Sequence, residues 1–119
     1  MKKLLPLLLF VLLAFAGCQP KGPVLYQMTD NPRELNANVE KFVKQTEKRS
    51  KHYTAMEWQI AVEQFVAMSK NYVEFRNAMT EEECNRFDAA RLQFMKAVET
   101  NGGEEWVAEV KEAYAKVMQ

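Results

Sequence analysis

The side chains most able to carry covalent chemistry in this sequence are two cysteines, Cys18 and Cys84, and one histidine, His52. Cys84 and His52 are the one possible thiol–imidazole pair after Cys18, and such a pair can supply a thiolate nucleophile. Cys84 falls in the first turns of an expected helix, where the helix dipole favours a thiolate. Three glutamates at 81–83 precede it and oppose that charge. We therefore expect a buried, unreactive Cys84 and an exposed His52 in the first loop.

Two acidic clusters offer carboxylates for metal binding or proton transfer. Glu81, Glu82 and Glu83 open one expected helix, and Glu104 and Glu105 open another. Carboxylates in a first helical turn complement the helix macrodipole, so we interpret both clusters as helix starts. One His and one remaining Cys suggest no transition-metal site, and the sequence contains no phosphate loop or nucleophile elbow. We expect no enzyme activity, no metal and no cofactor.

Cations gather near the end of the first expected helix. They complement the negative end of the helix dipole, and Glu40–Lys44 and Glu47–Lys51 have the i, i+4 spacing of helical ion pairs. A solvated helix face is the first interpretation. The functional alternative is a surface for an anionic partner, such as lipid headgroups or a cell-wall polymer. The candidate interaction surface comprises Lys44, Lys48, Arg49 and Lys51.

The first seventeen residues have the three parts of a secretory signal peptide. Lys2 and Lys3 form a positive start, residues 4–16 form an apolar run interrupted by one proline, and Ala16 and Gly17 are small. The run is too short for a membrane span, which needs roughly 20 residues. This segment therefore predicts export from the cytoplasm.

The signal segment ends at Cys18 instead of a plain small-residue cleavage site. Ala16-Gly17-Cys18 resembles the lipobox of bacterial lipoproteins, with Phe15 where that family usually has Leu. The resemblance implies that residues 1–17 are removed and that Cys18 is lipidated and becomes the new N-terminus. Gln19 resembles the sorting pattern of outer-membrane lipoproteins, which implies a lipid-anchored protein at the outer membrane facing the periplasm.

The remaining chain has the size and charge of one small domain. Removal of Lys2 and Lys3 with the signal leaves 14 Lys+Arg against 16 Asp+Glu. A net charge near −2 argues against general nucleic-acid binding. With Cys18 lipidated, Cys84 is the last thiol and no internal disulfide can form. The domain must therefore depend on its apolar core.

Residues 18–30 are predicted to form a lipidated N-terminus and a flexible tether. Pro20, Gly22 and Pro23 oppose regular structure. Roughly a dozen flexible residues would give a reach of about 20 Å. Four residues are apolar for a linker, and we expect them to pack back on the domain: Val24, Leu25, Tyr26 and Met28.

Residues 31–119 contain three clear signals for the start of a helix. Asn31 can cap a helix that has Pro32 at its first position and Glu34 at its third. Two later starts share the capping-box spacing, a Thr followed by Glu three residues on, flanked by an apolar staple pair. They are Thr54 and Glu57 with Tyr53 and Trp58, and Thr80 and Glu83 with Met79 and Cys84.

Apolar residues at helical spacing follow each start. The second helix is expected from Ala55 to about Ala78, and residues 101–103 separate a third helix from a fourth over Glu104 to Met118. Four amphipathic helices with short connections predict an all-α, up-and-down four-helix bundle. The alternative is three long helices with a loosely docked C-terminal helix. A second apolar face on the second helix, formed by Met56, Ile60 and Ala67, predicts that this helix is central.

A second resemblance concerns the domain itself. Tyr53-Thr54, Glu57-Trp58, Tyr72, and Thr80 with Glu82-Glu83 form a pattern similar to small helical lipoproteins of unknown function from Gram-negative bacteria. That resemblance implies a helical fold and an envelope location. The sequence thus predicts a membrane-anchored, non-enzymatic domain that binds another envelope component, a protein or the cell wall. The alternative is a carrier of a small apolar ligand or lipid, in a pocket lined by Trp58, Phe65, Tyr72 and methionines.

Overall fold

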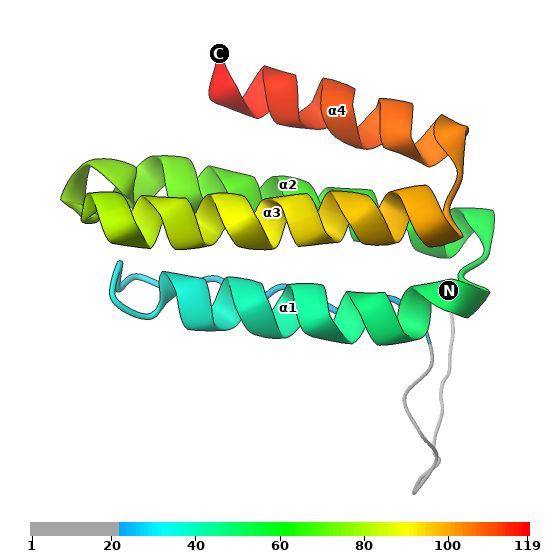
Figure 1. Ribbon diagram of the computed structural model, residues 1–119, viewed down its shortest axis with the longest axis horizontal. Helices are drawn as coiled ribbons and strands as arrows, with labels where there is room; N and C mark the ends of the chain where they lie inside the picture. The colour runs from blue at the N-terminus through cyan, green and yellow to red at the C-terminus, as the bar shows by residue number, and fades with distance from the viewer. Residues whose placement is uncertain (1–21) are drawn as a thin grey trace, which may run out of the picture.

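The computed structural model describes residues 22–119, so Cys18 and the signal segment lie outside the described part. Its regular elements are four α-helices and two short 3₁₀ turns, and the predicted all-α four-helix bundle is confirmed (Figure 1). Consecutive helices run in opposite directions, so α1 is parallel to α3 and α2 to α4. The elements are α1 (Leu35–Arg49), η2 (Ser50–His52), α2 (Ala55–Phe75), η3 (Arg76–Ala78), α3 (Glu81–Asn101) and α4 (Glu104–Met118).

Aromatic rings fill the space between α2 and α3 at the centre of the bundle. Phe65 of α2 stacks on Phe94 of α3 with ring centroids 4.7 Å apart, and Tyr72 stacks on Phe87 at 3.8 Å. Phe42 brings α1 to the same cluster, 5.7 Å from Phe94. α1 packs chiefly on α3, and α4 packs on α2 and α3 from the opposite side (Figure 1). These five rings are buried and form the core on which both outer helices rest.

The C-terminal helix is docked on the bundle, so the alternative of a loosely attached fourth helix does not describe this structure. Val110 at the middle of α4 is fully buried. The Arg91 guanidinium of α3 lies 4.5 Å from the centroid of the Tyr114 ring, a cation–π contact. Other residues expected to face inward are only half-buried, because α4 has helices on one side alone: Trp106, Val107, Tyr114 and Val117.

Both predicted capping boxes are confirmed at the starts of α2 and α3. Thr54 Oγ1 accepts from the Glu57 amide at 3.2 Å, and the Glu57 carboxylate accepts from the Thr54 amide at 2.8 Å. Thr80 and Glu83 make the same reciprocal pair: Thr80 Oγ1 accepts from the Glu83 amide at 3.1 Å, and the Glu83 carboxylate accepts from the Thr80 amide at 2.8 Å. Each box satisfies two backbone amides that would otherwise lack partners, which fixes where the helix begins.

The predicted start of α1 is wrong, because Asn31 does not cap the α-helix. Its side-chain oxygen accepts from the Arg33 amide at 2.9 Å and its carbonyl accepts from the Glu34 amide at 2.9 Å. This is a local turn, and α1 begins at Leu35. Asn favours such turns by bonding to the backbone two residues on, which competes with helix formation.

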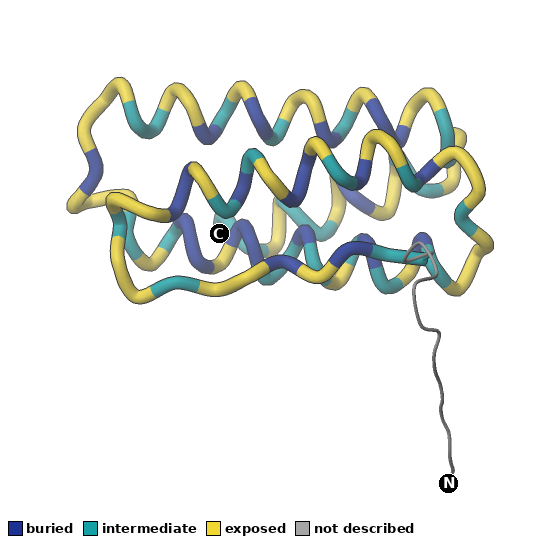
Figure 2. The backbone as a smooth tube through the Cα atoms, turned by 90° about the horizontal axis from the view of Figure 1, so that it is seen from below, coloured by how far each residue is buried: buried dark blue, intermediate teal, exposed yellow. Residues whose placement is uncertain are grey.

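Residues 22–30, here called the strap, lie along the bundle with their backbone extended. Successive side chains of an extended chain point to opposite faces. Val24 and Tyr26 are accordingly buried, as the sequence predicted, while Leu25 between them is 70% exposed (Figure 2). The expectation that Leu25 and Met28 also pack on the domain is wrong, since Met28 is 54% exposed. The packed part of the chain thus begins before residue 31.

A fully buried asparagine on α2 holds the strap in place. The Asn71 side-chain oxygen accepts from the Tyr26 hydroxyl at 2.8 Å and from the Thr29 amide at 3.1 Å, and its nitrogen donates to the Thr29 carbonyl at 3.1 Å. Gln64, two turns earlier on α2, accepts from the Tyr26 amide at 2.7 Å. The polar groups of the strap therefore find partners inside the bundle, as buried polar groups must.

Replacing Asn71 by alanine is expected to lower the free energy of unfolding by about 2 kcal/mol, because the buried Tyr26 hydroxyl and the part-buried backbone of Thr29 lose their partners. Chemical denaturation measures that loss, and amide exchange of residues 24–29 should become faster. The matched control is Asn85→Ala on the exposed face of α3, which should change neither. An unchanged denaturation midpoint for Asn71→Ala would contradict this account of the strap.

Alkaline pH should weaken the same contact. Burial raises the pKa of Tyr26 from 10.0 to about 12. The folded state therefore favours the neutral hydroxyl, whose contribution is fully present below pH 10 and is lost as the pH rises through about 12. We expect the melting temperature of the native protein to fall more steeply over this interval than that of Tyr26→Phe, which lacks the group. Equal slopes in melts across this pH series would refute the assignment.

Candidate functional site

The candidate interaction surface lies at the end of α1 and in η2, and we call it the basic surface: Lys44, Lys48, Arg49 and Lys51. The three lysines are exposed and Arg49 is half-buried. Within residues 22–119, none of the four takes part in an ion pair. Among the described residues, the predicted cations therefore have no carboxylate paired to them.

Neither of the two ion pairs expected along α1 and η2 is present among the described residues, and Glu40 pairs with α3 instead. Both carboxylate oxygens of Glu40 accept from the Arg86 guanidinium, at 3.0 and 2.6 Å. Planar guanidinium and carboxylate groups match in this two-bond arrangement, which a lysine cannot provide. Lys44 is left without Glu40, and no ion pair in the described chain joins Glu47 to Lys51. The cations of the basic surface are thus not neutralised along the helix as the spacing predicted.

The strap begins at the same end of the bundle as the basic surface. Gly22, the first described residue, adopts a φ of +95°, which favours glycine. A Cβ added there would lie 3.0 Å from a carboxylate oxygen of Glu57 in the first turn of α2. That turn directly follows η2, which carries Lys51. The chain therefore reaches the bundle beside the basic surface and not at the far end.

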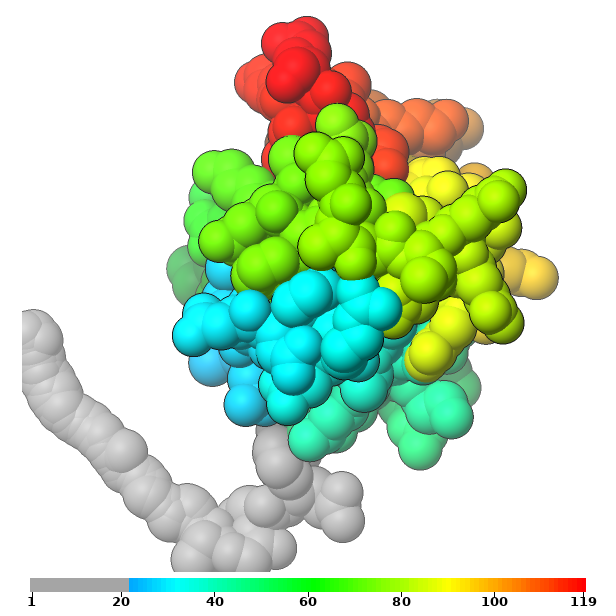
Figure 3. Space-filling view, turned by 90° about the vertical axis from the view of Figure 1, so that its left-hand side faces the viewer, coloured from blue at the N-terminus to red at the C-terminus, as the bar shows by residue number. Residues whose placement is uncertain are grey.

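The thiol and imidazole singled out in the sequence do not meet. His52 lies in η2 between α1 and α2, whereas Cys84 lies in the first turn of α3, next to the α2–α3 connection. These two connections are at opposite ends of the bundle, and the α2–α3 connection faces the viewer in Figure 3. Cys84 is half-buried, not buried as expected, and its Sγ lies 3.8 Å from the Arg76 carbonyl oxygen. The pair therefore forms no nucleophile and base.

The acidic cluster at the start of α3 stabilises that start and pairs with the turn that precedes α1. The backbone hydrogen bond from Thr80, with Arg33 nearby, lowers the pKa of Glu83. Arg33 forms an ion pair with Glu83 at 2.8 Å and also donates to the Ala78 carbonyl. Across the described residues, no three His, Cys, Asp or Glu side chains are placed to hold a metal ion together. No described helix is long and apolar enough to cross a membrane.

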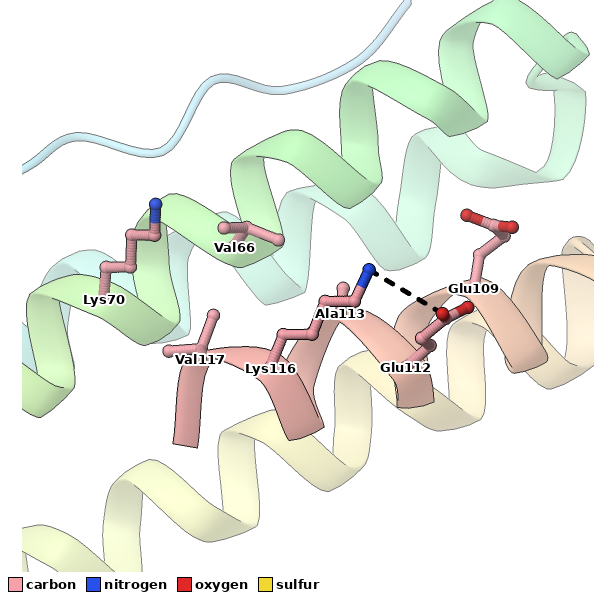
Figure 4. Close-up of a pocket in the computed structure, with 7 residues that line it drawn as sticks. All are labelled: Val66, Lys70, Glu109, Glu112, Ala113, Lys116 and Val117. Atoms are coloured by element: carbon pink, nitrogen blue, oxygen red, sulfur yellow. Dashed lines mark ion pairs between the residues drawn. The ribbon is translucent and has the colours of Figure 1, made fainter. Parts of the chain in front are cut away.

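The side chains proposed to line an apolar pocket are packed against other rings. Trp58, Phe65 and Tyr72 are all buried, and Phe65 and Tyr72 stack directly on rings of α3. A hollow of about 400 Å³ lies instead at the surface between α2 and α4 (Figure 4). Its floor is apolar and its rim carries positive and negative side chains. Lys116 Nζ lies 3.7 Å from Glu112 Oε2. It is lined by Val66, Lys70, Glu109, Glu112, Ala113, Lys116 and Val117.

Sequence reasoning missed the two features that relate the basic surface to the rest of the chain. The Glu40–Arg86 pair joins residues 46 positions apart, and the Tyr26–Asn71 bond joins residues 45 apart. Helical periodicity and i, i+4 spacing describe neighbours within one helix only. The one available signal was the apolar character of the strap, which indicated packing but not its direction along the bundle.

Comparison with known proteins assigns no family to this chain. No protein-family model matches the sequence, and no curated protein or solved structure matches it at a significant level.

Proposed function

We propose that this protein is an envelope lipoprotein, anchored through lipid on Cys18, whose helical domain binds another envelope component without catalysing a reaction. The observation that carries the proposal is Ala16-Gly17-Cys18 after a positive start and a short apolar run. Each buried acyl CH₂ contributes about 0.8 kcal/mol, so two or more chains hold a protein on a membrane stably. With Gln19 after the cysteine, we place the protein at the outer membrane, facing the periplasm.

The binding role is supported by what the domain exposes. The basic surface presents four cations that have no carboxylate partners in the described chain. On the other side, the hollow between α2 and α4 combines an apolar floor with a charged rim. The core of protein–protein interfaces is similarly apolar and its rim polar. Both surfaces suit an interaction module.

The anchoring half of the proposal is tested by the intact mass of the protein extracted from membranes. We expect an N-terminus at Cys18 and the added mass of acyl chains. A protein that retains residues 1–17, or that begins at Cys18 without added mass, would contradict lipid anchoring.

The binding half is tested by photo-cross-linking in living cells. A photoreactive amino acid at Lys70 or Lys116, on the rim of the α2–α4 hollow, is expected to yield a discrete cross-linked product. The control position is Leu92, which is 57% exposed on α3. Products that are equally abundant from all three positions, or from none, would contradict a specific partner at this hollow.

A further inference from the structure

We propose that the basic surface docks on anionic phospholipid headgroups of the membrane that holds the anchor, so that the α1 side of the bundle faces the lipid. This inference rests on the lipidation of Cys18 proposed above. It adds the orientation of the domain and the chemistry of the surface that it meets.

The chain between the anchor and the bundle is short. Four peptide units separate Cys18 from Gly22. They span about 14 Å at most, since an extended residue covers roughly 3.3–3.6 Å. The sequence-based expectation of a dozen-residue spacer does not hold, because the strap packs along the bundle from Val24 onward. The end of the bundle at Gly22 is therefore confined near the membrane.

The basic surface is at this same end of the bundle. Gly22 lies against Glu57 at the start of α2, one short turn after Lys51. The molecule measures 44 × 32 × 25 Å, and a tether of about 14 Å holds only the Gly22 end close to the membrane in every orientation. Attraction between cations and an anionic leaflet acts over a Debye length of about 8 Å at physiological salt. The short tether is what places the lysines in that range.

The carboxylates at this end are distributed unevenly around the bundle. Glu57 is engaged in its capping box, and Glu47 shares a surface hollow with Lys51 and Lys96. Glu104 and Glu105 begin α4, which lies on the side of the bundle opposite α1 (Figure 1). The end of the bundle is therefore basic on its α1 side and acidic on its α4 side. A negative membrane surface attracts the first and repels the second.

The test measures how close two labels come to the headgroups when the mature lipidated protein is reconstituted in vesicles. One fluorophore is placed at His52→Cys in η2 and the other, in a second variant, at Ala115→Cys on the exposed face of α4, both with Cys84→Ser. The vesicles contain phosphatidylglycerol and a lipid with a quenching headgroup. We expect strong quenching at position 52 and only background quenching at position 115.

Charge reversal tests whether the basic surface causes this orientation. Lys48→Glu with Lys51→Glu is expected to abolish the difference between the two labels, as is replacing phosphatidylglycerol by phosphatidylcholine. Each basic residue near an anionic surface strengthens attraction about fivefold, so two reversals remove a large part of it. The control is Lys111→Glu on the exposed face of α4, which should preserve the difference.

Equal quenching at both positions, or a difference that survives in phosphatidylcholine, would overturn the inference while leaving lipid anchoring intact. Anchoring itself is read separately from the intact mass of the same preparation. An orientation that requires added anionic cell-wall polymer instead of anionic lipid would also overturn it.

Discussion

Replacing Cys18 by alanine is expected to abolish acyl labelling completely and to leave residues 1–17 on the chain. The thiol is the attachment point that the lipobox resemblance implies, and alanine offers no nucleophile for a lipid. The measurement combines metabolic labelling with a fatty-acid analogue and intact mass. This is the largest functional effect that a single substitution should have in the protein, because every further property of the anchored domain depends on it.

The other cysteine provides the matched control for that experiment. Cys84 is half-buried at the start of α3, and its sulfur lies 3.8 Å from the Arg76 carbonyl oxygen. Cys84→Ala should therefore keep both the acyl label and the mature mass. A label that persists in Cys18→Ala, or that disappears in Cys84→Ala, would contradict lipidation at Cys18.

Local chemistry made the starts of α2 and α3 predictable from sequence. A capping box needs only a Thr and a Glu three residues apart, and both partners sit in the same helical turn. Thr54 and Thr80 were identified on that spacing, and their hydrogen bonds are present. The four-helix class followed for a similar reason, since an apolar stripe at a period of 3.6 residues must be buried against another element.

A competing local turn and a long-range hydrogen bond account for the features that the sequence did not predict. Asn31 satisfies the signal for a cap, but it forms a turn beside the strap, and Thr29 donates to the carboxylate of Glu34 at 3.0 Å. Asn71 resembles any polar residue on a helix surface until Tyr26 is placed against it. Such contacts depend on which elements become neighbours, and the periodicity within one element does not predict its neighbours.

The residues of the candidate site could be chosen from the sequence, but their position relative to the rest of the fold could not. The lysines and Arg49 were recognised from their number and their position at a helix end. Two contacts make these cations a candidate site. Glu40 pairs with Arg86 across the helix interface and so leaves Lys44 without that carboxylate, and Gly22 lies beside η2. Both require the folded chain.

Trp58→Ala is expected to lower the free energy of unfolding by about 3–5 kcal/mol, the range for removing a buried aromatic ring. Trp58 is only 3% exposed, and its ring meets that of Tyr53 edge-on with centroids 5.2 Å apart, as a staple requires. A Cβ added at Gly102 would lie 3.1 Å from the same ring. The indole therefore packs between the α1–α2 and α3–α4 connections, and its loss should loosen both.

The size of that loss can be judged against the whole domain and against two neighbouring substitutions. Small domains have a total stability of about 5–15 kcal/mol, and each kcal/mol corresponds to a melting shift of about 4–8 °C. Trp58→Ala should thus lower the melting temperature by about 12 °C or more. Thr54→Ala, which removes the cap, should cost about 1 kcal/mol. Met56→Ala, on the same helical turn but at a side chain 72% exposed, should stay within about 0.5 kcal/mol.

Thermal melts and chemical denaturation rank the three variants by stability, and that ranking tests whether Trp58 is a core residue. The packing account requires Trp58→Ala to be the most destabilising, Thr54→Ala intermediate and Met56→Ala nearly silent. If Trp58→Ala melted like the native protein, the indole would not be a core residue. Loss of binding to an envelope component in that variant would then identify the indole as part of a recognition surface, at the end of the bundle that we assign to the membrane.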